Sequence, residues 1–250
     1  NFVAGSDGVV SGNCNILAGS AYNVEGNYNA TFGNNNLISG NNNIVVGKEN
    51  NKTGYGDNNS IFGSKNTETN GYNCFIVGDN NSASNGSYDN VLGNNNQSIN
   101  GYGSIIAGIR NYQSNGSENA IFGYRNSAIN TDENLIAGYE NEISGTNDYR
   151  HYNFAGGVGN KLYDGEASFI FGWYNQLSGN YDFVAGDVQK VSGNNNTVFG
   201  KANEVSGNNS FVAGAGNYVS GNNINVVGEK NTLKNYADYG YSEIVLGDSN

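Results

Sequence analysis

Proline and methionine are absent from the 250 residues, and histidine and tryptophan occur once each. A stack of β-strands tolerates little proline, because proline lacks the backbone N–H that a strand ladder needs. The absence of proline therefore fits a chain whose backbone is paired throughout. With one histidine and two cysteines the chain cannot assemble a zinc site by itself.

Basic residues are also scarce. Lys and Arg number 11 against 22 Asp and Glu, which gives a net charge of −11. Nucleic acids and anionic membrane surfaces bind basic patches, so both are excluded as partners. No apolar run is long enough to span a bilayer, so we expect any membrane attachment to use an anchor outside this segment. The sequence begins and ends inside a repeat, and we interpret it as a fragment of a longer surface protein.

Glycine is abundant, with 38 residues, and it marks a repeat. The stretch 193–234 reads as GNNNTVFGKANEVS, GNNSFVAGAGNYVS and GNNINVVGEKNTLK. A fixed short period is typical of a solenoid in which each block is one coil. A glycine that follows an apolar triplet recurs about 17 times along the chain. We therefore predict one all-β parallel solenoid over residues 1–250, with inserted loops near 139–156 and 229–247.

The triplet before this glycine is predicted to be the strand of each coil. Its middle and third residues are apolar in nearly every coil, although they point to opposite faces. In the coil that ends at Gly156, Phe154 is taken as the middle residue. A strand that is apolar on both faces has to be covered on both, so we expect self-association along the stack. The strand residues predicted to form the core and the interface between copies are Val45, Ile106, Phe122, Phe199 and Val212.

Large and small side chains alternate within the triplets. Phe183 precedes Ala185 by two residues, whereas Ala120 precedes Phe122, as expected for a close-packed surface. Phe169 and Phe171 break this pattern.

Most coils carry an asparagine three residues after the glycine, as at Asn96 and Asn111. Stacking would align these amides in a hydrogen-bonded column. Cys14 and Cys74 lie four coils apart, about 19 Å, which is too far for a disulfide. We predict that both fill coil corners.

Blocks such as NNTVFGKANEVSG and NSFVAGAGNYVSG resemble the repeat of YadA-like heads, the head domains of trimeric autotransporter adhesins of Gram-negative bacteria. The resemblance covers essentially the whole chain. It implies a left-handed parallel β-roll, a homotrimer, and an extracellular location at the bacterial surface through an outer-membrane anchor absent from this segment. It also implies attachment to glycan or protein receptors on a host or on other bacteria.

Exposed aromatic residues are the candidate receptor site, because flat amphipathic rings suit glycan or protein recognition. The residues predicted to bind a receptor are Tyr139, Tyr149, Arg150, His151, Tyr152, Trp173, Tyr174 and Tyr181. A ladder of stacked rings without a binding role is the alternative. No convincing catalytic set is present, so we expect no enzyme activity, and we predict no metal and no cofactor.

The function predicted from these features is adhesion. The alternative is an ice-binding or purely structural solenoid. Ice-binding faces need a flat, regular column, commonly of threonine, and Thr31 and Thr197 are isolated in the triplets. A carbohydrate-processing β-helix would need longer coils and converging carboxylates.

Overall fold

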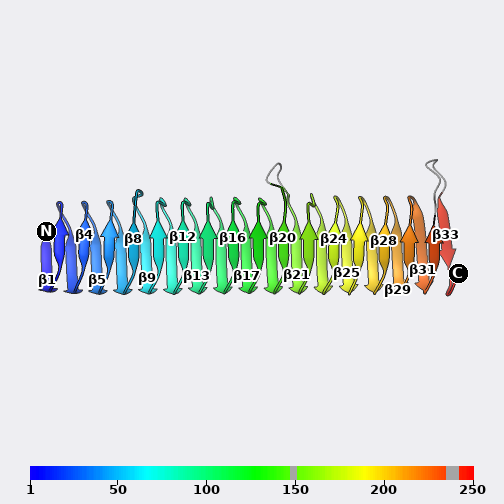
Figure 1. Ribbon diagram of the computed structural model, residues 1–250, viewed down its shortest axis with the longest axis horizontal. Coiled ribbons are helices and arrows are strands. Elements are labelled where there is room, and N and C mark those ends of the chain that lie inside the picture. Colours follow the sequence, from blue (N-terminus) through cyan, green and yellow to red (C-terminus); the bar gives the residue numbers. More distant parts are fainter. Residues whose placement is uncertain (147–150, 235–241) are drawn as a thin grey trace. The chain divides into compact units, whose positions relative to one another are not determined.

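The computed structural model describes residues 1–146, 151–234 and 242–250, and it contains two compact units, Asn1–Arg125 and Asn126–Asn250. The described residues form strands and turns, with no helix among them. Each coil has a long strand, usually of five residues, and a short strand of three (Figure 1). The chain is a left-handed parallel solenoid of about 16 coils, so the predicted fold class is confirmed.

Unit 1 alternates long and short strands from its first residue. The long strands are β1 (Phe2–Ser6), β3 (Ile16–Ser20), β5 (Ala30–Asn34), β7 (Ile44–Lys48), β9 (Ser60–Ser64), β11 (Phe75–Asp79), β13 (Asn90–Asn94), β15 (Ile105–Ile109) and β17 (Ala120–Tyr124). The short strands are β2 (Val9–Ser11), β4 (Asn23–Glu25), β6 (Leu37–Ser39), β8 (Asn51–Thr53), β10 (Thr67–Thr69), β12 (Ser82–Ser84), β14 (Gln97–Ile99) and β16 (Tyr112–Ser114).

Unit 2 has the same alternation. Its long strands are β19 (Leu135–Tyr139), β21 (Phe154–Val158), β23 (Phe169–Trp173), β25 (Phe183–Asp187), β27 (Thr197–Lys201), β29 (Phe211–Ala215), β31 (Ile224–Glu229) and β33 (Glu243–Leu246). Its short strands are β18 (Ser127–Ile129), β20 (Glu142–Ser144), β22 (Lys161–Tyr163), β24 (Gln176–Ser178), β26 (Lys190–Ser192), β28 (Glu204–Ser206), β30 (Tyr218–Ser220) and β32 (Thr232–Lys234).

The core of each unit lies between its long and short strands. In the five-residue and three-residue strands the second residue points inward, while the first and third point outward, as strand alternation requires; β31 begins one residue earlier, so its first and third residues point inward. Val45, Ile106 and Val212 are inward residues and are fully buried. Phe122 and Phe199 are third residues of long strands and remain 40% and 38% exposed. The predicted set therefore divides into core residues and outward-facing residues.

The predicted register is wrong by one residue at β21. Ala155, not Phe154, pairs with the inward residues Ile136 and Ile170, and Gly157 aligns with the coil glycines. A shift of one residue exchanges the two faces of a strand, and this shift places the phenyl ring outside and a methyl group inside. Gly156 and Gly157 are adjacent, and either could serve as the coil glycine, so the sequence was compatible with Phe154 or Ala155 as the inward residue.

The coil glycines are required by the close approach of neighbouring coils. Gly93 has a φ of +109°, and a Cβ at this position would lie 2.1 Å from the carbonyl oxygen of Gly108 in the next coil. Any side chain would clash with the backbone, and the positive φ alone disfavours one. The regular spacing of glycine in the sequence follows from this repeated contact.

The predicted asparagine column is confirmed, and it is buried. Asn96 Oδ1 accepts a hydrogen bond from the backbone N–H of Asn111 at 2.9 Å, and Asn96 Nδ2 donates to the carbonyl of Gly108 at 2.8 Å. Each amide thus satisfies the backbone at a turn and links it to the next coil. This column runs along the turn that follows each long strand.

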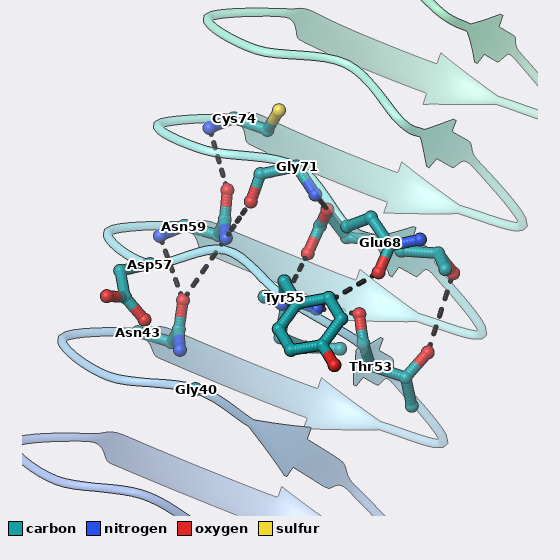
Figure 2. A network of polar contacts seen from close by, with 12 residues as sticks. Gly40, Asn43, Thr53, Tyr55, Asp57, Asn59, Glu68, Gly71 and Cys74 are labelled. Carbon is teal, nitrogen blue, oxygen red and sulfur yellow. Dashed lines mark hydrogen bonds and ion pairs between the residues drawn. The ribbon is translucent and has the colours of Figure 1, made fainter.

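A second column, which the sequence analysis did not identify, runs along the turn before each long strand. Asn43 Oδ1 accepts from the N–H of Asn59 at 3.0 Å, and Asn59 Oδ1 accepts from the N–H of Cys74 at 2.9 Å (Figure 2). Cys74 is a buried member of this column, and burial raises the pKa of its thiol to about 12. Both cysteines are free, and Cys14 is exposed in the equivalent turn of an earlier coil. Cys74 therefore fills a coil corner as predicted, whereas Cys14 lies in a turn and is not enclosed.

Candidate functional site

The short strands present a column of hydroxyl groups. The third residue of most short strands is serine or threonine, and strand pairing in register aligns these side chains in one column with about 4.8 Å between neighbouring coils. Five coils interrupt the column, with Glu25, Ile99, Ile129, Tyr163 and Lys234. We refer to these residues as the hydroxyl column. They are Ser11, Ser39, Thr53, Thr69, Ser84 and Ser114 in unit 1, and Ser144, Ser178, Ser192, Ser206 and Ser220 in unit 2.

In unit 1 the hydroxyl column is joined by a second column of small polar side chains. The strands β8, β10 and β12 present the outward pairs Asn51 and Thr53, Thr67 and Thr69, and Ser82 and Ser84. We call these six residues the hydroxyl patch. The two residues of a pair are two positions apart along a strand, about 6.6 Å. The patch is therefore a small two-dimensional lattice of hydroxyl, amide and methyl groups.

Side chains in the hydroxyl patch are held in place. All six are half-buried, and Thr53 Oγ1 lies 3.5 Å from Thr69 Oγ1. The backbone of β10 is paired with β8 on one side and with β12 on the other. Short side chains on a paired backbone have little rotamer freedom left to lose on binding.

Charge distinguishes the two units on this face. From β6 to β16 no first or third strand residue is charged. In unit 2 the first residues include two ion pairs, Lys161 with Glu142 at 3.5 Å and Lys190 with Glu204 at 3.1 Å. Exposed pairs of this kind contribute little to stability, but their long, hydrated side chains interrupt the regular surface.

A buried ion pair lies directly beneath the hydroxyl patch. Lys52 Nζ and Glu68 Oε2, from the middle of β8 and β10, are 3.0 Å apart, and both side chains are fully buried. Glu68 also accepts a hydrogen bond from the backbone N–H of Gly71 (Figure 2). Burial raises the pKa of the Glu68 carboxyl to about 7, against the opposing effect of Lys52. The interior of these coils therefore contains a charged pair directly beneath the surface on which the hydroxyl patch repeats.

The residues predicted to bind a receptor do not form one patch. Tyr139, Trp173 and Tyr174 lie at the ends of long strands or in the turn that follows. His151, Tyr152 and Tyr181 lie in the turn before a long strand. A five-residue strand separates the two turns by roughly 16 Å. Tyr149 and Arg150 lie outside the described residues.

The contacts of these residues are mostly local. The rings of Trp173 and Tyr174 are 6.5 Å apart, and the Tyr181 hydroxyl donates to Glu166 Oε1 at 3.0 Å. His151 is only 7% exposed, and its Nδ1 accepts from the N–H of Asp132 at 3.3 Å. The expectation that His151 belongs to an exposed binding patch is therefore wrong, because its imidazole completes a turn.

The part of the chain that the structure describes contains no cluster of three or more His, Cys, Asp or Glu side chains that could hold a metal ion. Within the same residues, no helix is long and apolar enough to cross a membrane.

The two threonines considered for an ice-binding column, Thr31 and Thr197, both lie in long strands. Thr31 is an inward residue and is 1% exposed, and Thr197 lies on the long-strand face. The hydroxyl column instead occupies the third residue of the short strands, which directly precedes a glycine in most coils, whereas Thr69, Ser84 and Ser114 are followed by asparagine. The recurring letters VSG in EVSG and YVSG are the signal that could have found it.

Comparison with protein-family models identifies one match, described as "Grass antifreeze beta roll". It aligns with residues 106–200 and 143–247, which together make up more than half of the chain. A comparison with curated proteins gave no match.

This match overturns the predicted YadA-like trimeric autotransporter head and the adhesin function that rested on it. The predicted location at the bacterial surface loses its support for the same reason, and it stays an untested prediction. Short coils with glycine turns specify a β-roll, and they do not distinguish an adhesin head from an antifreeze roll. The chain belongs to the grass antifreeze beta roll family.

Proposed function

We propose that this protein binds ice, without catalysis, and that the hydroxyl patch of unit 1 is the surface that contacts the crystal. Ice presents a flat, periodic array of water molecules. A protein surface matches such an array when its own groups are flat, periodic and fixed. Stacked coils give this repeat automatically, because every coil places the same position one ladder spacing from the last.

The side-chain chemistry of the hydroxyl patch suits this role. Threonine combines a hydroxyl group, which can replace a lattice water, with a methyl group that gains from losing contact with liquid water. The half-buried side chains are already ordered, so binding costs little further entropy. Charged groups hold their hydration strongly, and none occupies the first or third position of a short strand from β6 to β16.

One observation carries the proposal beyond the family assignment: three successive coils present paired small polar side chains in register, from Asn51 and Thr53 to Ser82 and Ser84. The corresponding face of unit 2 is interrupted by ion pairs. We therefore assign the principal contact to unit 1.

The test compares the same substitution at two matched positions. Thr67 and Thr232 are both first residues of short strands, in β10 and β32. We expect Thr67→Lys to remove most inhibition of ice recrystallisation, because a hydrated ammonium then stands inside the patch. Thr232→Lys should leave the inhibition close to that of the wild type.

Circular dichroism and thermal unfolding would establish that both variants keep the fold. Equal inhibition by the two variants would contradict the assignment to the hydroxyl patch. Absence of any effect of the wild-type protein on ice growth would contradict ice binding itself.

A further inference from the structure

The long strands of unit 2 carry a continuous row of phenylalanine rings. We call this surface the phenyl face. It consists of Phe154, Phe169, Phe171, Phe183, Phe199 and Phe211. Neighbouring rings are in contact, with centroids 5.7 Å apart for Phe154 and Phe169 and 5.4 Å apart for Phe183 and Phe199. The row continues to Phe211, whose ring lies 6.1 Å from that of Phe199.

The alternation of large and small residues explains why the rings close into one surface. The ring of Phe183 packs edge-to-face against Phe171 at 6.1 Å, and Ala185 is only 7% exposed. Phe154 similarly covers Gly156, where an added Cβ would meet its ring at 2.7 Å. Phe171, which broke the pattern in the sequence, supplies a ring on the third-residue column.

The phenyl face is large for a surface exposed to water. Phe169, Phe171, Phe199 and Phe211 are 47%, 44%, 38% and 37% exposed. At roughly 200 Å² for a whole phenylalanine, each of these rings leaves about 80 Å² in contact with water. Together these four rings leave about 330 Å² of apolar surface in contact with water. Monomeric proteins rarely expose a contiguous apolar patch of more than a few hundred Å².

The first and third residues of the strands that carry the phenyl face, β21, β23, β25, β27 and β29, are uncharged. Charge occurs on these strands only at the fifth position, as Asp187 of β25 and Lys201 of β27. The short-strand face of unit 2 carries Glu142, Lys161, Lys190 and Glu204. Because the chain has a net charge of −11, two copies repel each other at most orientations. Where the phenyl faces meet, two copies can approach without burying a charged side chain from the first- or third-residue columns.

We propose that the phenyl face is an interface between copies of this chain, packed ring against ring. The four most exposed rings supply about 330 Å² of apolar surface, which suits the apolar centre of an interface of roughly 800 Å² per partner. Phenylalanine is enriched and charge depleted at the centre of such interfaces. The face lacks the hydroxyl lattice found in unit 1, since Thr197 is its single threonine. The phenyl face shares no residue with the hydroxyl patch, so this proposal does not rest on ice binding.

Sedimentation equilibrium over a range of protein concentrations tests the proposal. One chain has a mass of 26.4 kDa, and we expect the wild-type protein to reach two or three times this mass as its concentration rises. Phe211→Lys should reduce the mass to that of one chain. Tyr218→Lys is the matched control, because Phe211 and Tyr218 are both 37% exposed and lie on opposite faces of one coil.

Far-ultraviolet circular dichroism would confirm that the variants fold, and Phe171→Lys serves as a second variant should Phe211→Lys fail to do so. A wild-type mass of one chain at every concentration would overturn the proposal. It would also be overturned if the control dissociated as fully as the variants of the phenyl face.

Discussion

Asp182 lies in the turn before a long strand, at the position where the next coil carries the amide side chain of Asn196. Its Oδ1 accepts from the N–H of Asn196 at 2.6 Å, but its Oδ2 is buried and has no hydrogen-bond partner in the described structure. At the equivalent place in the next coil, Asn196 Nδ2 donates to the carbonyl of Gly207 at 2.9 Å. We expect Asp182→Asn to keep the first bond and to add the missing donor, which would face the carbonyl of Gly193.

The size of the effect follows from two contributions. A new amide–carbonyl hydrogen bond contributes about 1 kcal/mol. Burial raises the pKa of Asp182 from 3.8 to about 6. This shift corresponds to a destabilisation of the folded state at pH 7 of at most about 3 kcal/mol, which solvent screening reduces by roughly half and which Asp182→Asn would remove. We therefore expect Asp182→Asn to stabilise the protein by about 2 kcal/mol at pH 7. The melting temperature should rise by roughly 4–8 °C for a chain of this size.

The effect should depend on pH. A carboxyl whose pKa is higher in the folded state contributes stability below its unfolded pKa and loses it as the pH rises through the folded value. The difference between the variant and the wild type should therefore be smallest below about pH 4 and complete above about pH 6. Thermal unfolding followed by circular dichroism at pH 4 and pH 7 measures it. A variant that is less stable at pH 7, or an advantage equal at both pH values, would refute this reasoning.

Two further predictions concern the interior of unit 1. Gly93→Ala should lower the free energy of unfolding by more than about 3 kcal/mol, because its Cβ would meet the Gly108 carbonyl. The control Gly103→Ala should lower it by only about 1 kcal/mol, because its Cβ would have no neighbour nearer than 3.7 Å. Urea titrations measure both values. Lys52→Leu should cost about 3–5 kcal/mol by leaving Glu68 buried without a counter-charge. The double variant Lys52→Leu and Glu68→Leu should recover most of this loss by calorimetry, and no recovery would show that the pair is not coupled.

The periodic features of the fold could be predicted from the sequence. Glycine spacing, apolar triplets and the asparagine after each glycine report contacts that recur in every coil, so each is repeated many times in the sequence. The coil register at Phe154 could not be fixed, because Gly156 and Gly157 suit either alignment. The burial of Lys52 and Glu68, at positions where most other coils have hydrophobic residues, could not be predicted either, since an isolated Lys or Glu in a polar sequence gives no sign of being buried.

The candidate site was harder to predict than the fold. Strand alternation placed the outward residues of the long strands correctly, including Phe122 and Phe199. The short strands, at three residues, carry too little alternation to be recognised alone, so the hydroxyl column was missed. The aromatic residues were grouped because some follow the coil glycine and the others were expected on nearby coils, although the width of a coil separates the two turns that hold them.

The central claim is that the hydroxyl patch, and not the phenyl face, contacts ice. Thermal hysteresis of Thr67→Lys and Phe199→Lys, each compared with the wild-type protein at equal molar concentration of folded chain, tests it most directly. We predict that Thr67→Lys loses most of the hysteresis and that Phe199→Lys retains at least the activity of a single chain. Loss of hysteresis in Phe199→Lys with full activity in Thr67→Lys would contradict the claim and would place the ice on the long strands.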